Sequence, residues 1–81
     1  MRKRRLPGRP TASAHVLSRL GDALRRLGKL EEAQGALAEA LQLHQAAHDT
    51  TGMAHDARSL GDTLTQLDRL EEAEEIGRAH V

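Results

Sequence analysis

Three histidines lie close together in the sequence and have a spacing that could hold a metal ion. His44 and His48 are four residues apart, which places them on one side of a helix, and His55 follows after a short loop. No acidic residue completes the set, because Asp49 would point elsewhere on the helix and Asp56 belongs to the next segment. Histidines near a helix end are commonly surface residues that interact with its negative pole. The sequence therefore predicts no metal site and no cofactor.

The sequence also lacks the residue combinations of common catalytic sites. It contains no cysteine, so no thiolate is available as a nucleophile or a metal ligand. The run Glu71, Glu72, Glu74 and Glu75 would lie along one exposed helix and would not hold two carboxyl groups across a substrate. No glycine-rich phosphate loop or nucleophile elbow is present. We expect that the protein is not an enzyme and has no catalytic residues.

A segment that occurs twice organises the chain. Residues 60–73 repeat residues 20–33 at a spacing of 40 residues, and nine of the fourteen positions are identical. A match in one register without a gap indicates that one supersecondary unit has been used twice. The unit is a helix, a tight corner and a second helix.

The first unit predicts two helices. The first is expected near residues 14–27, with Thr11 or Ser13 as its N-cap, and the second over about residues 30–47. Gly28 marks the corner, because glycine adopts the left-handed conformation that often ends a helix. The positions predicted to face a partner helix are Leu17, Leu20, Leu24 and Leu27 in the first helix and Leu30, Ala33, Leu37, Ala40, Leu41, His44 and Ala47 in the second.

The second unit predicts a third helix and a weaker fourth. After a loop over residues 48–52, the third helix is expected to begin at Met53 or Ala54. Asp68 stands where the first unit has Gly28, and it is expected to cap a fourth helix that begins at Leu70 and frays. The apolar stripe predicted for the third helix consists of Ala57, Leu60, Leu64 and Leu67.

Gly21 and Gly61 occupy equivalent positions inside two predicted helices. Glycine costs about 1 kcal/mol relative to alanine at such a position. Its use at both positions indicates that a neighbouring helix approaches closely, and we expect Ala33 to lie opposite Gly21.

With these positions in order, the unit resembles the tetratricopeptide repeat. The first unit matches the family pattern at Leu17, Leu20, Gly21, Leu24, Gly28, Leu30, Ala33, Leu37 and Ala40. The second matches it at Ala57, Leu60, Gly61, Leu64, Leu70 and Ala73, and departs from it at Asp68, Gly77 and His80.

The spacing of 40 residues exceeds the usual repeat of about 34 and is similar to that of long-repeat members in kinesin light chains and bacterial signalling proteins. Leucines replace the usual aromatic residues, and Gln45 stands where a proline often closes the repeat. HEAT repeats have a similar length but fit the Leu-Gly pairs poorly.

This resemblance implies an all-α fold of antiparallel helix-turn-helix repeats, an α-solenoid fragment of about two repeats that acts as a protein-protein interaction scaffold. In the family, first helices line a groove that binds a peptide or a partner domain. Arg25, Arg26 and Arg58 could meet a carboxylate of such a partner, although a solvated helix face is the plainer interpretation. The positions carried over as peptide-binding are His15, Ser18, Asp22, Arg25, Arg26, His55, Arg58, Asp62, Thr65 and Gln66.

Both ends of the chain fall outside the repeats, which we place at residues 14–53 and, in part, 54–75. Residues 1–13 are expected to form a disordered basic arm, since the first ten residues contain five Lys or Arg, two prolines and no acidic residue. Residues 76–81 have the sequence that a common short-read sequencing adapter encodes when it is read from its second base. We therefore expect residues 76–81 to be a non-native tail. We also expect that the natural protein is longer and contains further repeats.

The function expected is binding of a protein or peptide partner, with self-association through the exposed terminal repeat as a further possibility. One alternative is the sensor or helper region of a multidomain ATPase or transcriptional regulator. A small nucleic-acid-binding protein that uses Lys3, Arg4 and Arg5 ranks last. No apolar run is long enough to cross a membrane, and the lack of cysteine suits a cytoplasmic protein.

Overall fold

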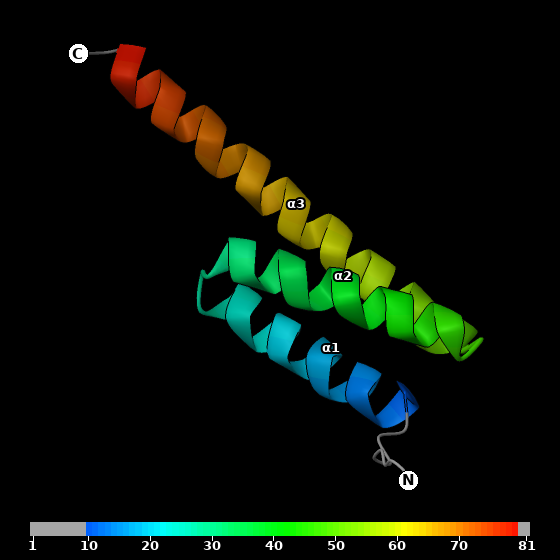
Figure 1. The fold of residues 1–81 in the computed structure, drawn as a ribbon. Coiled ribbons are helices and arrows are strands. Elements are labelled where there is room, and N and C mark those ends of the chain that lie inside the picture. Colours follow the sequence, from blue (N-terminus) through cyan, green and yellow to red (C-terminus); the bar gives the residue numbers. More distant parts are fainter. Residues whose placement is uncertain (1–9, 80–81) are drawn as a thin grey trace, which may run out of the picture.

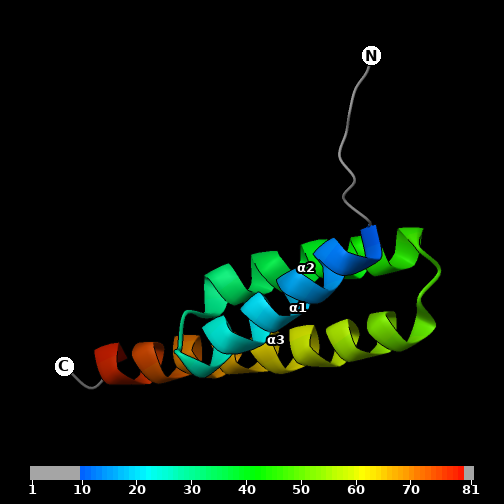
Figure 2. The ribbon, with the colours of Figure 1, turned by 90° about the horizontal axis from the view of Figure 1, so that it is seen from below.

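The computed structural model describes residues 10–79, which form three α-helices (Figure 1). α1 spans Pro10–Arg26, α2 spans Leu30–Ala46 and α3 spans Thr50–Ala79. Each helix runs antiparallel to the one before it, and the C-terminal part of α3 continues past the corner between α1 and α2 (Figures 1 and 2). The described range contains no strand, so the predicted all-α architecture is confirmed.

The corner between α1 and α2 forms as the sequence predicts. Gly28 has a φ angle of 84°. Its N–H donates to the carbonyl of Arg25 at 3.0 Å, and the N–H of Lys29 donates to the carbonyl of Leu24 at 2.9 Å. These two bonds are the Schellman arrangement, which satisfies carbonyls at a helix end and depends on a left-handed residue. The chain can therefore reverse within three residues.

α2 ends in the same arrangement, with a histidine in place of glycine. His48 has a φ angle of 57°. Its N–H donates to the carbonyl of Gln45 at 3.1 Å, and the N–H of Asp49 donates to the carbonyl of His44 at 2.9 Å. The turn occupies only residues 47–49, so the expected loop over residues 48–52 is too long.

α3 begins at Thr50, earlier than the predicted Met53 or Ala54. The reason is Asp49, whose side chain caps the helix: its Oδ1 accepts the N–H of Gly52 at 2.9 Å. At the start of α1 the predicted caps Thr11 and Ser13 lie inside the helix, which the structure begins at Pro10. Proline is tolerated in a first turn because N–H groups there have no partner within the helix.

The predicted corner at Asp68 and the separate fourth helix are wrong, because α3 continues without a break from Thr50 to Ala79. Asp68 and Arg69 lie within this helix. Among the described residues, a positive φ occurs only at Gly28 and His48. Glycine adopts this conformation at no steric cost and aspartate does so only at a cost, so the replacement of Gly28 by Asp68 makes a reversal of the chain there less favourable. The predictions for residues 1–9 and 80–81 concern positions outside the described range.

The core lies mainly on α2. Five of its predicted inward positions are buried, namely Leu30, Ala33, Leu37, Ala40 and His44. The other two, Leu41 and Ala47, are half-buried. These residues recur at intervals of three and four, which gives α2 a continuous face toward both neighbours.

The apolar stripe predicted for α1 is only partly right. The buried positions of this helix are Ala14, Ser18 and Gly21. Leu20 and Leu27 are 48% and 73% exposed. Gly21 lies against Leu37 of α2, and Ser18 contacts Asp56 of α3, so the buried side of α1 consists of small residues.

Gly21 is a point of close contact between α1 and α2, although its neighbour is Leu37 rather than the predicted Ala33. A Cβ atom on Gly21 would lie 2.5 Å from Cγ of Leu37, which is fully buried. A Cβ atom on Gly61 would meet nothing within 4 Å. The two equivalent glycines therefore have different surroundings in this chain.

α3 packs on the other helices through a face that the sequence pattern did not indicate. Its buried residues are Gly52, Asp56, Ser59 and Thr63. Of the predicted stripe, Ala57 and Leu64 are exposed and Leu60 and Leu67 are half-buried. The inner face of α3 is thus small and polar, and much of its apolar stripe faces outward. None of the helices within residues 10–79 has the length and apolar character needed to cross a bilayer.

These surroundings predict opposite outcomes for alanine at the two glycines. Gly61→Ala should raise the free energy of unfolding by up to about 1 kcal/mol, because only helix propensity changes. Gly21→Ala gains the same propensity but overpacks Leu37, so it should be less stable than Gly61→Ala by about 1–3 kcal/mol. Urea unfolding followed by far-UV circular dichroism measures the difference. Equal stabilisation by both substitutions would show that α1 and α2 are not in close contact at Gly21.

Candidate functional site

A buried polar network joins one residue from each helix. Nδ1 of His44 on α2 lies 2.5 Å from Oδ2 of Asp56 on α3, and the hydroxyl of Ser18 on α1 donates to the other oxygen, Oδ1. The exposed fractions are 1% for His44, 0% for Asp56 and 5% for Ser18. A carboxylate can only accept, so this contact favours the tautomer of His44 with its hydrogen on Nδ1. Both oxygens of the buried carboxylate are thus satisfied.

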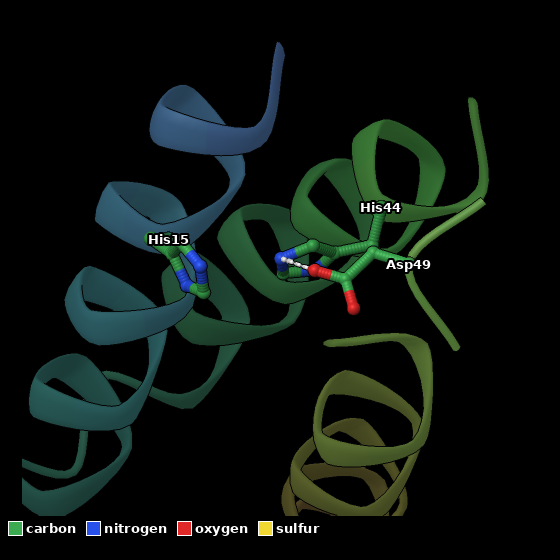
Figure 3. Close-up of side chains that lie close together, drawn as sticks. All are labelled: His15, His44 and Asp49. Carbon is green, nitrogen blue, oxygen red and sulfur yellow. Dashed lines mark ion pairs between the residues drawn. The ribbon is translucent and has the colours of Figure 1, made fainter. Parts of the chain in front are cut away.

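The backbone of α3 makes room for the ring of His44. A Cβ atom on Gly52 would overlap the imidazole carbon Cδ2, so only glycine fits at this position of α3. Asp49 caps α3 through Oδ1 and directs its second oxygen, Oδ2, to within 3.8 Å of His44 Nε2 (Figure 3). The expectation that Asp49 points away from His44 is wrong, because the chain leaves the helix at His48 before it reaches Asp49.

His15 on α1 lies beside His44 and Asp49, and the three residues form one group. Its ring meets that of His44 edge to face, with the ring centroids 5.3 Å apart and an angle of 70° between the planes (Figure 3). His15 is exposed, whereas His44 is buried. Among the described residues, Nε2 of His44 is a buried atom with no hydrogen-bond partner. The group therefore contains an unpaired imidazole nitrogen beside a second imidazole and a carboxylate.

A pocket of about 490 Å³ opens next to this group. It lies between α1 and the start of α3, and on its far side Nε2 of His55 is 3.0 Å from Oδ2 of Asp22. The pocket is lined by His15, Ser18, Arg19, Asp22, His44, Asp49, Thr51, Gly52 and His55.

The serine, aspartate and histidine of the network are not arranged for nucleophilic catalysis. A serine nucleophile needs a base that takes its proton, usually a histidine. Here Ser18 donates to Asp56, and His44 contacts the opposite oxygen of the same carboxylate. Ser18 is also almost fully buried. The network is therefore suited to holding the helices and the His44 ring in place.

Four of the positions predicted to contact a peptide come together at the pocket: His15, Ser18, Asp22 and His55. The structure does not bring the other six to this pocket. Gln66 lines a separate hollow near the α1–α2 corner. Arg25 is half-buried, and Arg26, Arg58, Asp62 and Thr65 are exposed.

Sequence reasoning missed the network because its residues do not follow the repeat. At the spacing of 40 residues, Ser18 corresponds to Arg58 and Asp56 corresponds to Val16. A comparison of the two units therefore gives no sign that Ser18 and Asp56 meet. The cap could have been found from the sequence, because aspartate is one of the residues preferred at the N-cap. Asp49 was therefore a candidate for the start of the next helix.

We predict that Asp56→Ala lowers the free energy of unfolding by about 1–3 kcal/mol, because it leaves the buried Ser18 hydroxyl and His44 Nδ1 without a partner. Asp62→Ala is the matched control on the same helix; since Asp62 is exposed, this change should stay within about 0.5 kcal/mol. Urea unfolding of both variants tests this. Equal stability of the two variants would rule out a structural role for the network.

Comparison with known families agrees with the helix order. A family model described as Tetratricopeptide repeat matches residues 11–80, which include all but the first residue of α1 and the whole of α2 and α3. Comparisons with curated proteins and with solved structures give no significant match. Such repeats generally act as protein-protein interaction modules. The match extends over most of the sequence, and the chain belongs to the tetratricopeptide repeat family.

Proposed function

We propose that this chain binds a peptide or a partner domain through the surface formed by α1 and α3. The observation that supports this most directly is the pocket of about 490 Å³ between these two helices, which is lined largely by polar and charged side chains. A pocket of this size with several converging polar groups is a common binding site. Recognition requires no chemistry, which agrees with the arrangement of Ser18, Asp56 and His44.

Three arginines on this surface, with Asp22 and Asp49 beside them in the pocket lining, offer contacts to a partner that carries a carboxylate. Arg19 lines the pocket, Arg25 lies about one turn beyond the pocket residue Asp22 along α1, and Arg58 is exposed on α3. A guanidinium with a free donor forms strong, directional hydrogen bonds with a carboxylate. We propose that an acidic residue or a free C-terminus of the partner meets these arginines.

A second part of the proposal is that further repeats of the same parent protein cover α3. Leu70 is 53% exposed, whereas its equivalent Leu30 is 5% exposed. Leu64 is 44% exposed, and Gly61 has open space where Gly21 has Leu37. Gly61 and Leu64 lie one turn apart on α3, and Gly61 is the equivalent of Gly21, the residue at which α1 receives Leu37 of α2. Repeats of this kind depend on neighbours for their stability. Self-association through the same face, or a role as a regulator's helper region, would use this surface in a different way.

The binding proposal predicts a dependence on the arginines. A pool of peptides with a free acidic C-terminus should bind, and the same pool with amidated ends should bind more weakly. Arg25→Ala and Arg58→Ala should each weaken binding by about tenfold through loss of a charge-assisted contact. Arg78→Ala is the control, because Arg78 is exposed near the other end of α3. Fluorescence anisotropy measures the affinities. Equal binding of free and amidated pools, or no effect at Arg25 and Arg58, would contradict the proposal.

The proposal of further repeats can be tested by adding the missing helix. Residues 68–81 are replaced by a copy of residues 28–47, which supplies a glycine corner and a second helix. We expect a higher midpoint of urea unfolding, because the copied Leu37 packs on Gly61 and covers Leu64. The control is the same graft with that copied leucine changed to aspartate. The proposed packing would be contradicted if the graft has the same unfolding midpoint as the chain without it, or if the control graft raises the midpoint by the same amount.

A further inference from the structure

We propose that His15, His44 and Asp49 bind a divalent transition-metal ion, with zinc as the best match. Each residue offers one ligand atom, and the three atoms all lie within 4.8 Å of one another. They come from three parts of the chain: α1, the C-terminal turn of α2, and the turn that leads into α3 (Figure 3). The ion would therefore link all three helices at one end of the molecule.

The state of His44 Nε2 is the observation that points to a ligand. The side chain of His44 is 1% exposed, and this nitrogen has no hydrogen-bond partner within residues 10–79. A buried polar atom left unpaired costs about 1–3 kcal/mol. The nearest charged group is Oδ2 of Asp49 at 3.8 Å, which is too far for a hydrogen bond. A metal ion between the two atoms would satisfy both.

The surroundings of His44 are those of a metal ligand. Histidines that bind a metal through one nitrogen usually donate the other N–H to a carboxylate, which fixes the tautomer and the orientation of the ring. Nδ1 of His44 makes this contact with Asp56, which is held in turn by the hydroxyl of Ser18. The lone pair of Nε2 is thereby directed toward His15 and Asp49.

The other two ligands can adjust to an ion. Donors about 2.1 Å from a tetrahedral zinc ion lie about 3.4 Å from one another. The distance from His44 Nε2 to Asp49 Oδ2 is 3.8 Å, and the widest separation in the set is no more than 4.8 Å. His15 is exposed and can rotate inward, and the exposed side chain of Arg19 can turn to solvent. Asp49 is anchored by its cap on Gly52, which leaves Oδ2 free to bind.

Two imidazoles and one carboxylate suit zinc, which accepts nitrogen and oxygen ligands and is often held by three protein residues with a fourth position open. The fourth position would face the pocket, where water or a donor from a bound partner can complete the coordination. This inference does not depend on the peptide-binding proposal, because the metal set is complete without a peptide.

The two other histidines whose spacing resembled a metal site in the sequence, His48 and His55, provide the controls. His48 is exposed and serves as the left-handed residue after α2. His55 lines the same pocket but is paired with Asp22. Neither belongs to the group of three ligands.

The test is a titration with Zn²⁺ of the chain purified without a polyhistidine tag, by calorimetry, with Co²⁺ absorption as a probe of coordination. We expect one ion per chain, reversal by a chelator, and a higher unfolding temperature with Zn²⁺ because only the folded chain presents the site. His15→Ala and Asp49→Asn should each weaken binding by at least about tenfold, since each removes or neutralises one ligand. His48→Gly, which removes the imidazole but keeps the left-handed turn that places Asp49, and His55→Ala should leave the affinity unchanged.

The ligand variants leave the interior intact, because His15 is exposed and asparagine at position 49 can still cap α3. Unchanged far-UV circular dichroism without metal confirms this. The proposal is overturned if no saturable binding is seen, if His15→Ala binds as the unsubstituted chain does, or if His48→Gly or His55→Ala abolishes binding instead.

Discussion

The contact between His44 and Asp56 is the interaction on which the arrangement of the three helices depends. The inner face of α3 offers little apolar surface, since its buried residues are Gly52, Asp56, Ser59 and Thr63. A buried carboxylate is tolerated only when its oxygens are satisfied. Asp56 therefore requires His44 from α2 and Ser18 from α1 at the same time. Because Asp56 needs both partners, the position of α3 against the pair formed by α1 and α2 is more specific than apolar packing alone would make it.

The same contact determines what the surface beside it can do. It orients the imidazole of His44 and leaves Nε2 free at the edge of the pocket. The turn between α2 and α3 adds to this arrangement, because His48 adopts a left-handed conformation and brings Asp49 back toward His44. A polar core of this kind links the stability of the fold to the chemistry of the site.

The sequence predicted those parts of the fold that depend on local pattern. The buried face of α2, the corner at Gly28 and the family itself follow from spacing and from one glycine. The faces of α1 and α3 were predicted less well, because a leucine stripe shows that a surface is apolar without showing which neighbour covers it. The corner at Asp68 was predicted from its equivalence to Gly28, although aspartate adopts the left-handed conformation less readily than glycine does. The network was missed because Ser18 and Asp56 have no counterparts in the other unit.

The most direct test of this account is the position of the hydrogen on the ring of His44, measured by long-range nitrogen–proton NMR correlation in the metal-free chain. The account predicts that the hydrogen resides on Nδ1, held by Asp56, and that Nε2 carries none. Asp56→Ala should remove this preference. A hydrogen on Nε2 of the parent chain would contradict the account, because it would mean that Asp56 does not orient His44 and that the nitrogen facing Asp49 is not free to bind.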